Sequence, residues 1–252
     1  MLARLLPSLS FIAAACLAFT LFGCAGVFAP APSTSRAPAA EMPVRDSLRA
    51  KFVLTVVDST GKDQELDAVL FAVPHLRYRM ELTGPMGVGV ASLLWTSDGW
   101  NMVFPTEKKY IAGVGYMVGI VGDNTMPMVP IHQMADIFDG ILVPENSEVL
   151  AESDSAGFHV VKVRAPSGMM FTYGKQGGDV AWLMRGSGDN AEVLRFSDFK
   201  EFEGVRAPGY VTFEAGGKTF MKMRVKKVTR KKPFSLGTWR LNVPKSYKRI
   251  GG

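Results

Sequence analysis

Few side chains of this 252-residue sequence have the types and spacing that catalysis or metal binding requires. The three histidines, His75, His132 and His159, stand far apart and fit no metal-binding spacing. Asp136 and Asp139 lie three residues apart, which favours the solvent-facing side of a helix over a catalytic pair. No Gly-x-Ser-x-Gly sequence marks a nucleophile. We therefore expect no enzyme, no metal and no cofactor.

The most informative reactive residue is Cys24. Arg4 and the apolar stretch 5–20 are typical of an export signal, and the stretch is short for a membrane-spanning helix. It ends in Leu21-Phe22-Gly23-Cys24, which resembles the lipobox of bacterial lipoprotein precursors. The resemblance implies cleavage before Cys24, a diacylglyceryl thioether on its sulfur and N-acylation by a fatty acid such as palmitate. The alternative is a plain anchor, or a secreted protein in which Cys24 is incidental.

Cleavage at this point divides the chain into a signal peptide, residues 1–23, and a mature protein without a free thiol, because Cys16 leaves with the signal. Residues 24–46 are rich in Ala and Pro and lack periodicity, which predicts a tether after the lipidated cysteine. Ala25 stands where an Asp retains enteric lipoproteins in the inner membrane. We therefore expect a lipid-anchored protein in the outer membrane, with its domain facing the periplasm.

From residue 47 to residue 229 the pattern changes to short strands. Residues 76–83 alternate apolar and charged side chains, as a half-buried strand does, and Ser97-Asp98-Gly99 favours a tight hairpin. Turns of this kind separate roughly eleven strands in meander order, and residues 131–138 predict a short amphipathic helix. The predicted fold class is mainly β (α+β). A sheet of this size curls, and the Gly- and Met-rich stretch 113–130 is the expected lid over its concave face.

The chain is rich in large flexible or aromatic apolar residues, with 14 Met, 16 Phe and 4 Trp. Met accommodates varied apolar partners, so these residues favour an apolar cavity between strands and lid. The expected lining residues are Leu54, Val56, Tyr78, Met80, Leu82, Trp95, Trp100, Met102, Met134 and Phe138. An ordinary core is the alternative for any one of them, because alternation does not say which face of a sheet is concave.

Basic residues concentrate near the C-terminus of a chain whose formal net charge is +6. They suit anionic lipid headgroups, although a solvated strand face followed by a basic tail is the plainer interpretation. Nucleic acid would suit them too, but an exported lipoprotein does not meet it, so we expect no nucleic-acid partner. Residues 230–252 form a basic C-terminal extension that can add a strand.

Three segments in order resemble the LolB family of outer-membrane lipoprotein receptors. The first is Arg77–Gly87, with an Arg-Tyr-Arg strand, then Leu-Thr and a Gly-Pro-Met-Gly turn. The second is Met126–Ile131 together with Gly140–Pro144, and the third is Val205–Lys218. The resemblance extends over residues 51–228.

This resemblance implies an unclosed antiparallel β-barrel with a short helical lid and a cavity for acyl chains, without a cofactor. The implied partners are lipid acyl chains, the membrane and a periplasmic lipoprotein carrier. In the family the Pro-Leu-Gly turn projects an apolar side chain that helps to deliver cargo into the membrane. Pro85, Met86 and Gly87 occupy that turn here. The alternative for Met86 is a side chain folded back on the sheet.

Two functions fit these observations. The first is a receptor that binds the acyl chains of lipoproteins and inserts them into the outer membrane, which the Met86 turn favours. The second is a lipid-binding or structural envelope lipoprotein of the same fold that transfers nothing, which the basic extension favours as a protein-docking surface.

The lipobox predicts that the mature protein begins at an acylated Cys24. Mass spectrometry of the N-terminal peptide from membrane-extracted protein should show the mass of a diacylglyceryl group plus one amide-linked acyl chain. An unmodified Cys24, or a mature chain that begins elsewhere, would contradict the prediction.

Overall fold

The computed structural model describes residues 47–57, 61–115, 131–188, 191–231 and 233–250. In these residues fourteen strands form one sheet, two more form a separate hairpin, and there is one α-helix. The prediction of a mainly β fold built on an unclosed sheet is confirmed. The predicted signal peptide, Cys24 and tether lie outside the described residues, as does most of the expected Gly- and Met-rich lid.

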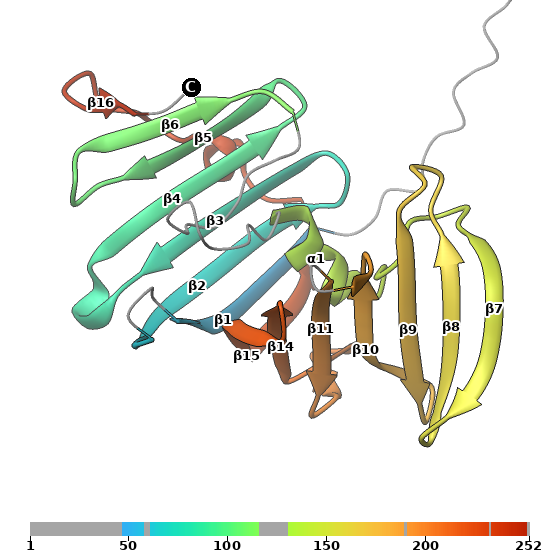
Figure 1. Ribbon diagram of the computed structural model, residues 1–252. Coiled ribbons are helices and arrows are strands. Elements are labelled where there is room, and N and C mark those ends of the chain that lie inside the picture. The colour runs from blue at the N-terminus through green and yellow to red at the C-terminus, as the bar shows by residue number, and fades with distance from the viewer. Residues whose placement is uncertain (1–46, 58–60, 116–130, 189–190, 232, 251–252) are drawn as a thin grey trace, which may run out of the picture. The chain divides into compact units, whose positions relative to one another are not determined.

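The sheet consists of two antiparallel meanders (Figure 1). The first contains β1 (Ser47–Val57), β2 (Asp63–Val73), β3 (Arg77–Thr83), β4 (Gly89–Thr96), β5 (Gly99–Phe104) and β6 (Lys109–Gly113). The second contains β7 (Glu148–Ser155), β8 (Phe158–Arg164), β9 (Met170–Gln176), β10 (Asp179–Arg185), β11 (Glu192–Ser197), β14 (Tyr210–Ala215) and β15 (Lys218–Lys231). The separate hairpin, β12 (Lys200–Phe202) and β13 (Val205–Ala207), interrupts the second meander.

The two meanders are joined by one long pairing between β1 and β15. Its register runs from Ser47 opposite Lys231 to Val56 opposite Met221, with a bulge beside Lys51. Both strands alternate apolar and polar residues, so their apolar side chains lie together on one face. We call this the inner face and the opposite one the outer face.

The inner face carries the core and the helix α1 (Ile131–Asp139), which lies between the two meanders in Figure 1. Phe138 of α1 packs on Phe52 of β1, with ring centroids 6.0 Å apart. The side chain of Asp139 is only 4% exposed, and its carboxylate forms an ion pair with the guanidinium of Arg230 of β15 at 2.6 Å. Asp139 therefore does not face solvent, as its spacing from Asp136 suggested, because Arg230 compensates its buried charge.

Gly140 ends α1, as the sequence predicted. Its φ of +70° is a left-handed conformation that favours glycine. The N–H of Ile141 donates to the carbonyl of Asp136 at 3.0 Å, which is the hydrogen bond of a Schellman cap. The apolar segment 141–143 follows this cap directly.

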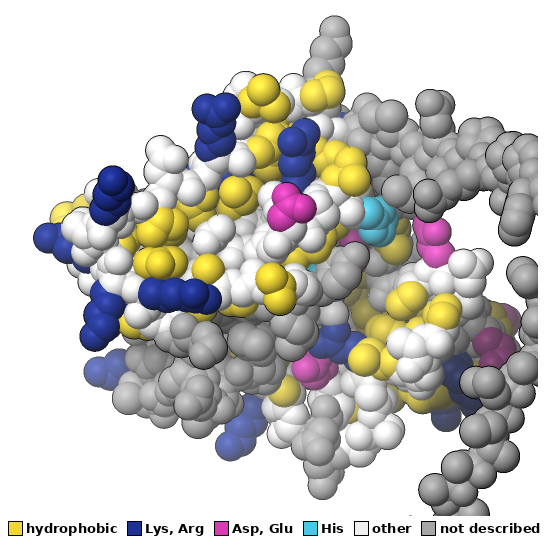
Figure 2. Space-filling model, turned by 90° about the horizontal axis from the view of Figure 1, so that it is seen from above, with side chains coloured by type: hydrophobic (Ala, Val, Ile, Leu, Met, Phe, Trp, Pro, Cys, Tyr) yellow, Lys and Arg dark blue, Asp and Glu magenta, His cyan; other side chains and the backbone are white. Residues whose placement is uncertain are grey.

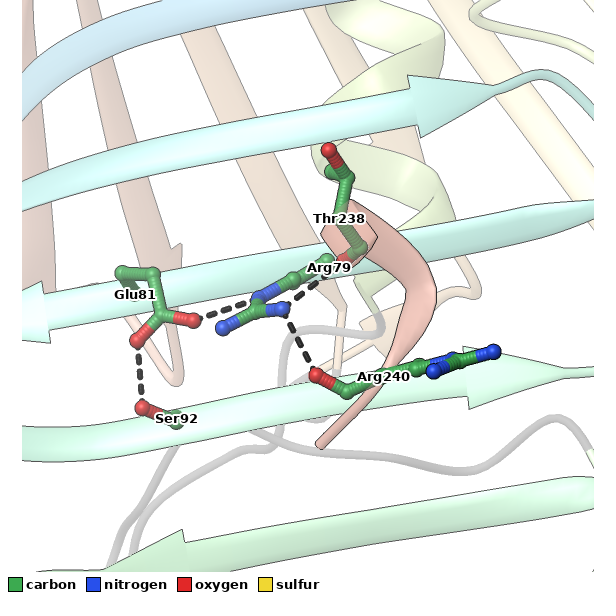
Figure 3. A network of polar contacts seen from close by, with 5 residues as sticks. All are labelled: Arg79, Glu81, Ser92, Thr238 and Arg240. Carbon is green, nitrogen blue, oxygen red and sulfur yellow. Dashed lines mark hydrogen bonds and ion pairs between the residues drawn. The ribbon is translucent and has the colours of Figure 1, made fainter. Parts of the chain in front are cut away.

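The C-terminal extension packs on the outer face of the first meander. Phe234 contacts Phe71 edge to face at 5.3 Å, and Trp239 lies against both Phe234 and the guanidinium of Arg77. Arg79 donates to the backbone carbonyls of Thr238 and Arg240 at 2.8 and 2.9 Å (Figure 3). The extension is thus part of the folded domain.

Figure 3 also shows why Arg79 points at the extension. Glu81 binds the Arg79 Nε at 2.6 Å, and the Ser92 hydroxyl donates to the other carboxylate oxygen of Glu81. This chain of contacts fixes the guanidinium, so its remaining donors face the two carbonyls.

The strands differ from the prediction in number and in three places. β7 is absent from the prediction because its side chains are almost all exposed and therefore lack an apolar alternation. β15 extends past residue 229 to Lys231, so the predicted boundary cuts through a strand. The short hairpin β12–β13 also went unpredicted. The strand that the extension was expected to add is the two-residue β16 (Lys248–Arg249), which is parallel to β6.

Trp239 should make the extension a measurable part of the domain's stability. Trp239→Ala removes its contacts with Phe234 and Arg77, and we expect a loss of about 3 kcal/mol in the free energy of unfolding. Urea denaturation measures the free energy of unfolding of the variant and of the unmodified protein. Leu236→Ala in the same turn, where Leu236 is 72% exposed, is the control and should change it by less than about 0.5 kcal/mol. Equal values for the two variants would mean that the extension does not contribute.

Candidate functional site

A cavity of about 370 Å³ lies on the inner face, between α1 and the second meander. This volume is within the range of small-molecule sites, which is roughly 300–1,000 Å³. Its walls come from helix α1, the segment after it, three strands of the second meander, the turn between β2 and β3, and the start of β3. The lining residues are His75, Tyr78, His132, Gln133, Asp136, Ile137, Ile141, Leu142, Val143, Pro144, Glu145, Phe171, Leu183, Arg185 and Leu194.

The walls of the cavity are mostly apolar. Leu183 of β10 lies directly opposite Leu194 of β11, and Phe171 of β9 pairs with the next inward residue, Arg185. Alternation along these strands points all four side chains to the inner face. The capped end of α1 brings Leu142 to the other side of the cavity. A long apolar group can therefore contact strands on one side and the helix segment on the other.

Charged and polar side chains also line the cavity, namely His75, His132, Gln133, Asp136, Glu145 and Arg185. Arg185 forms an ion pair with Glu192 on the neighbouring strand. Burial lowers the pKa of His132, and the charges of Arg185 and His75 lower it further, so the imidazole favours its neutral form. Figure 2, seen from above, shows histidine and acidic side chains between groups of hydrophobic side chains.

The turn between β2 and β3 fixes the aromatic wall. His75 has a φ of 64°, and its backbone N–H donates to the Tyr78 hydroxyl at 2.8 Å. Tyr78 is only 2% exposed, and its ring packs against Trp95 at 5.5 Å. The histidines at 75 and 132, which stand far apart in sequence, both line this cavity, whereas His159 lies on β8 beside Asp154.

The ten predicted lining residues are nearly all in the core. Leu54, Tyr78, Met80, Leu82, Trp95, Met102, Met134 and Phe138 are buried, and Val56 and Trp100 are partly buried against them. Of the ten, Tyr78 alone also lines the cavity. The others are buried in or packed against the core, whereas the walls of this cavity come mainly from α1, the segment after it and the second meander.

The residues that sequence reasoning missed come from β9, β10, β11 and the segment after α1. Leu183 and Leu194 follow ordinary strand alternation, which does not reveal that their face is left uncovered. The segment 141–143 is the one signal that was present, because three consecutive apolar residues follow a helix-ending glycine. Only the packing of α1 shows that this segment forms a wall.

The turn between β3 and β4 exposes its central residue. Met86 is 99% exposed with a φ of 59°, and Val88 beside it is 49% exposed. The N–H of Gly84 donates to the Val88 carbonyl at 2.8 Å, and the N–H of Gly87 donates back to the Gly84 carbonyl at 3.2 Å. These bonds close the turn and leave the Met86 side chain pointing into solvent, not folded back on the sheet.

In the described part of the chain, no group of three potential ligands could hold a metal ion. No helix there is long and apolar enough to cross a membrane.

Comparison with known proteins identifies the fold. No protein-family model and no curated protein matches this chain. A DUF1329 family protein from Desulfovibrio piger has a similar structure, with a TM-score of 0.57 and 10% identity, covering 77% of this chain and 90% of that one. A LolA superfamily protein from Nitrosomonas europaea is also similar, with a TM-score of 0.54 and 9% identity. The match covers 79% of this chain and 92% of that one. The chain therefore has a LolA-like fold, and the resemblance to LolB in particular stays a prediction.

Proposed function

We propose that this chain is an outer-membrane lipoprotein that binds lipoprotein acyl chains and inserts them into the membrane, as a LolB-like receptor does. It works without catalysis, is held by acylated Cys24 with its domain in the periplasm, and receives cargo from a periplasmic lipoprotein carrier. The observation that carries the proposal is the cavity under α1. Its walls are mostly apolar and include several charged and polar side chains, which suits an amphiphile with an acyl chain and a polar end.

The exposed Met86 supports transfer in addition to binding. A fully exposed Met on a closed turn gains free energy only by contacting something apolar, and a membrane or an acyl chain supplies that contact. The turn lies in the first meander and the cavity lies mostly over the second, so insertion and cargo binding use different residues.

The second candidate function is lipid binding without transfer, in an envelope assembly. The C-terminal extension favours it, because Arg240 and Lys245 remain exposed on a segment that is fixed to the outer face. A fixed basic segment offers a protein partner a preformed surface.

Filling the cavity should prevent acyl-chain binding. Leu142→Trp places a larger apolar side chain in the cavity, and we expect the affinity for a fluorescent fatty acid to fall about ten-fold or more. Fluorescence titration measures it. Leu236→Trp adds the same side chain at an exposed site on the extension and is the control. Unchanged binding by a folded Leu142→Trp protein would exclude this cavity as the acyl-chain site.

Placing a charge on the turn should slow transfer but leave binding intact. Inserting one such apolar side chain is worth about 1.5–3 kcal/mol, so Met86→Glu should reduce lipoprotein transfer into liposomes about ten-fold or more, with fatty-acid affinity unchanged. Val149→Glu, at an exposed apolar residue of β7, is the matched control. Wild-type transfer by Met86→Glu would remove the insertion role. No transfer by the unmodified protein would favour the second candidate function.

A further inference from the structure

A small cationic cavity lies on the outer face, where β1 pairs with β15. It has a volume of about 90 Å³ and is lined by Arg49, Lys51, Lys227 and Thr229. Lys51 stands directly opposite Lys227, and Arg49 stands directly opposite Thr229. The four residues therefore occupy two successive outward positions on each strand, and three of them are cations.

This arrangement is unfavourable without an anion. Like charges directly opposite each other in a sheet destabilise it, and the bulge beside Lys51 brings Lys226 next to the same pair. Lys226 is compensated by Asp67 at 2.8 Å, and Lys227 by Glu203. No ion pair among the described residues involves Lys51 or Arg49, so two positive charges at the cavity lack a compensating carboxylate.

Arg49 is held in place with an unused donor. Its Nε is buried and has no hydrogen-bond partner, although a buried donor normally has one. Its guanidinium lies over the ring of Phe71 at 5.4 Å, and Phe71 is in turn covered by Phe234 of the C-terminal extension. This packing fixes the orientation of the guanidinium beside the cavity.

We infer that this cavity binds a phosphate group. The volume is about three times the share of one water molecule in the liquid, roughly 30 Å³, which suits a compact anion better than a large ligand. A fixed guanidinium presents donors that match phosphate oxygens, and Lys51 and Lys227 add positive charge at the same cavity. The Thr229 hydroxyl also lines the cavity and donates to the Arg49 carbonyl at 3.4 Å, so it donates to a phosphate oxygen only by turning away from that carbonyl. The phosphate is either that of a phospholipid headgroup or free inorganic phosphate.

The site is independent of the acyl-chain cavity. Arg49 and Lys51 alternate with Ala50 and Phe52, whose side chains are buried on the inner face with α1. A phosphate on the outer face and an acyl chain on the inner face therefore lie on opposite faces of the sheet, and the two cavities share no lining residue. Loss of one function should leave the other unchanged.

Titration of the full chain in non-ionic detergent with inorganic phosphate tests the inference. At constant ionic strength we expect one site per chain by calorimetry, together with a shift of the Arg49 Nε–H resonance in NMR spectra. Lys51→Gln should weaken binding about ten-fold or more, because a charge-assisted contact is lost. Lys51 is exposed, so this variant should fold, whereas Arg49→Gln also removes the contact with Phe71.

Lys222→Gln is the matched control, because Lys222 is another exposed outer-face lysine of β15 and pairs with Asp63. It should bind phosphate within about twofold of the unmodified chain. Glycerophosphoglycerol, the soluble headgroup of phosphatidylglycerol, distinguishes the sources, since tighter binding than inorganic phosphate assigns the site to a lipid and weaker binding to the free ion. The inference is overturned if neither probe shifts the Arg49 resonance. It is also overturned if Lys222→Gln weakens binding as much as Lys51→Gln, which indicates diffuse attraction.

Discussion

The pairing of β1 with β15 is the constraint on which the rest of the structure depends. It joins the first strand of the domain to the last strand of the second meander, and so makes one sheet of two meanders. Because side chains alternate along both strands, the same ladder places apolar residues under α1 and basic residues on the outer face. The register therefore decides which side chains form the cationic cavity, and a slip by one residue would turn them to the inner face.

The position of α1 decides where the inner face remains open. Phe138 and Asp139 attach the helix to β1 and β15, at the centre of the sheet. Tyr78 and Trp95 of the first meander pack against each other, whereas β10 and β11 contribute the smaller side chains of Leu183 and Leu194 to the cavity wall. Smaller side chains facing a helix held at a fixed distance leave space between them. The cavity is thus explained by packing and needs no special motif.

The C-terminal extension covers the outer face as α1 covers the inner one. Its aromatic residues shield Phe71, and β16 pairs with β6 at one edge of the sheet. Covered edges are less available for association with other chains. The other edge, β7, is exposed but carries acidic residues such as Glu152 and Asp154, which also disfavour association. The extension therefore completes the domain, and its exposed basic side chains remain available for a partner.

The sequence alone determined the strand alternation, the hairpin turns and the helix with its Gly140 cap, because each follows from local spacing and backbone preference. It also predicted the turn at residues 85–87, but only the structure decided that the Met86 side chain is exposed. The sequence could not determine β7, whose exposed side chains carry no pattern, or the cavity walls. Alternation shows that Leu183 faces one side of a sheet, but only the packing of a distant helix decides whether that side is filled or open. The tertiary structure likewise decided that Lys51 lies opposite Lys227, since residues 176 positions apart meet only through the ladder.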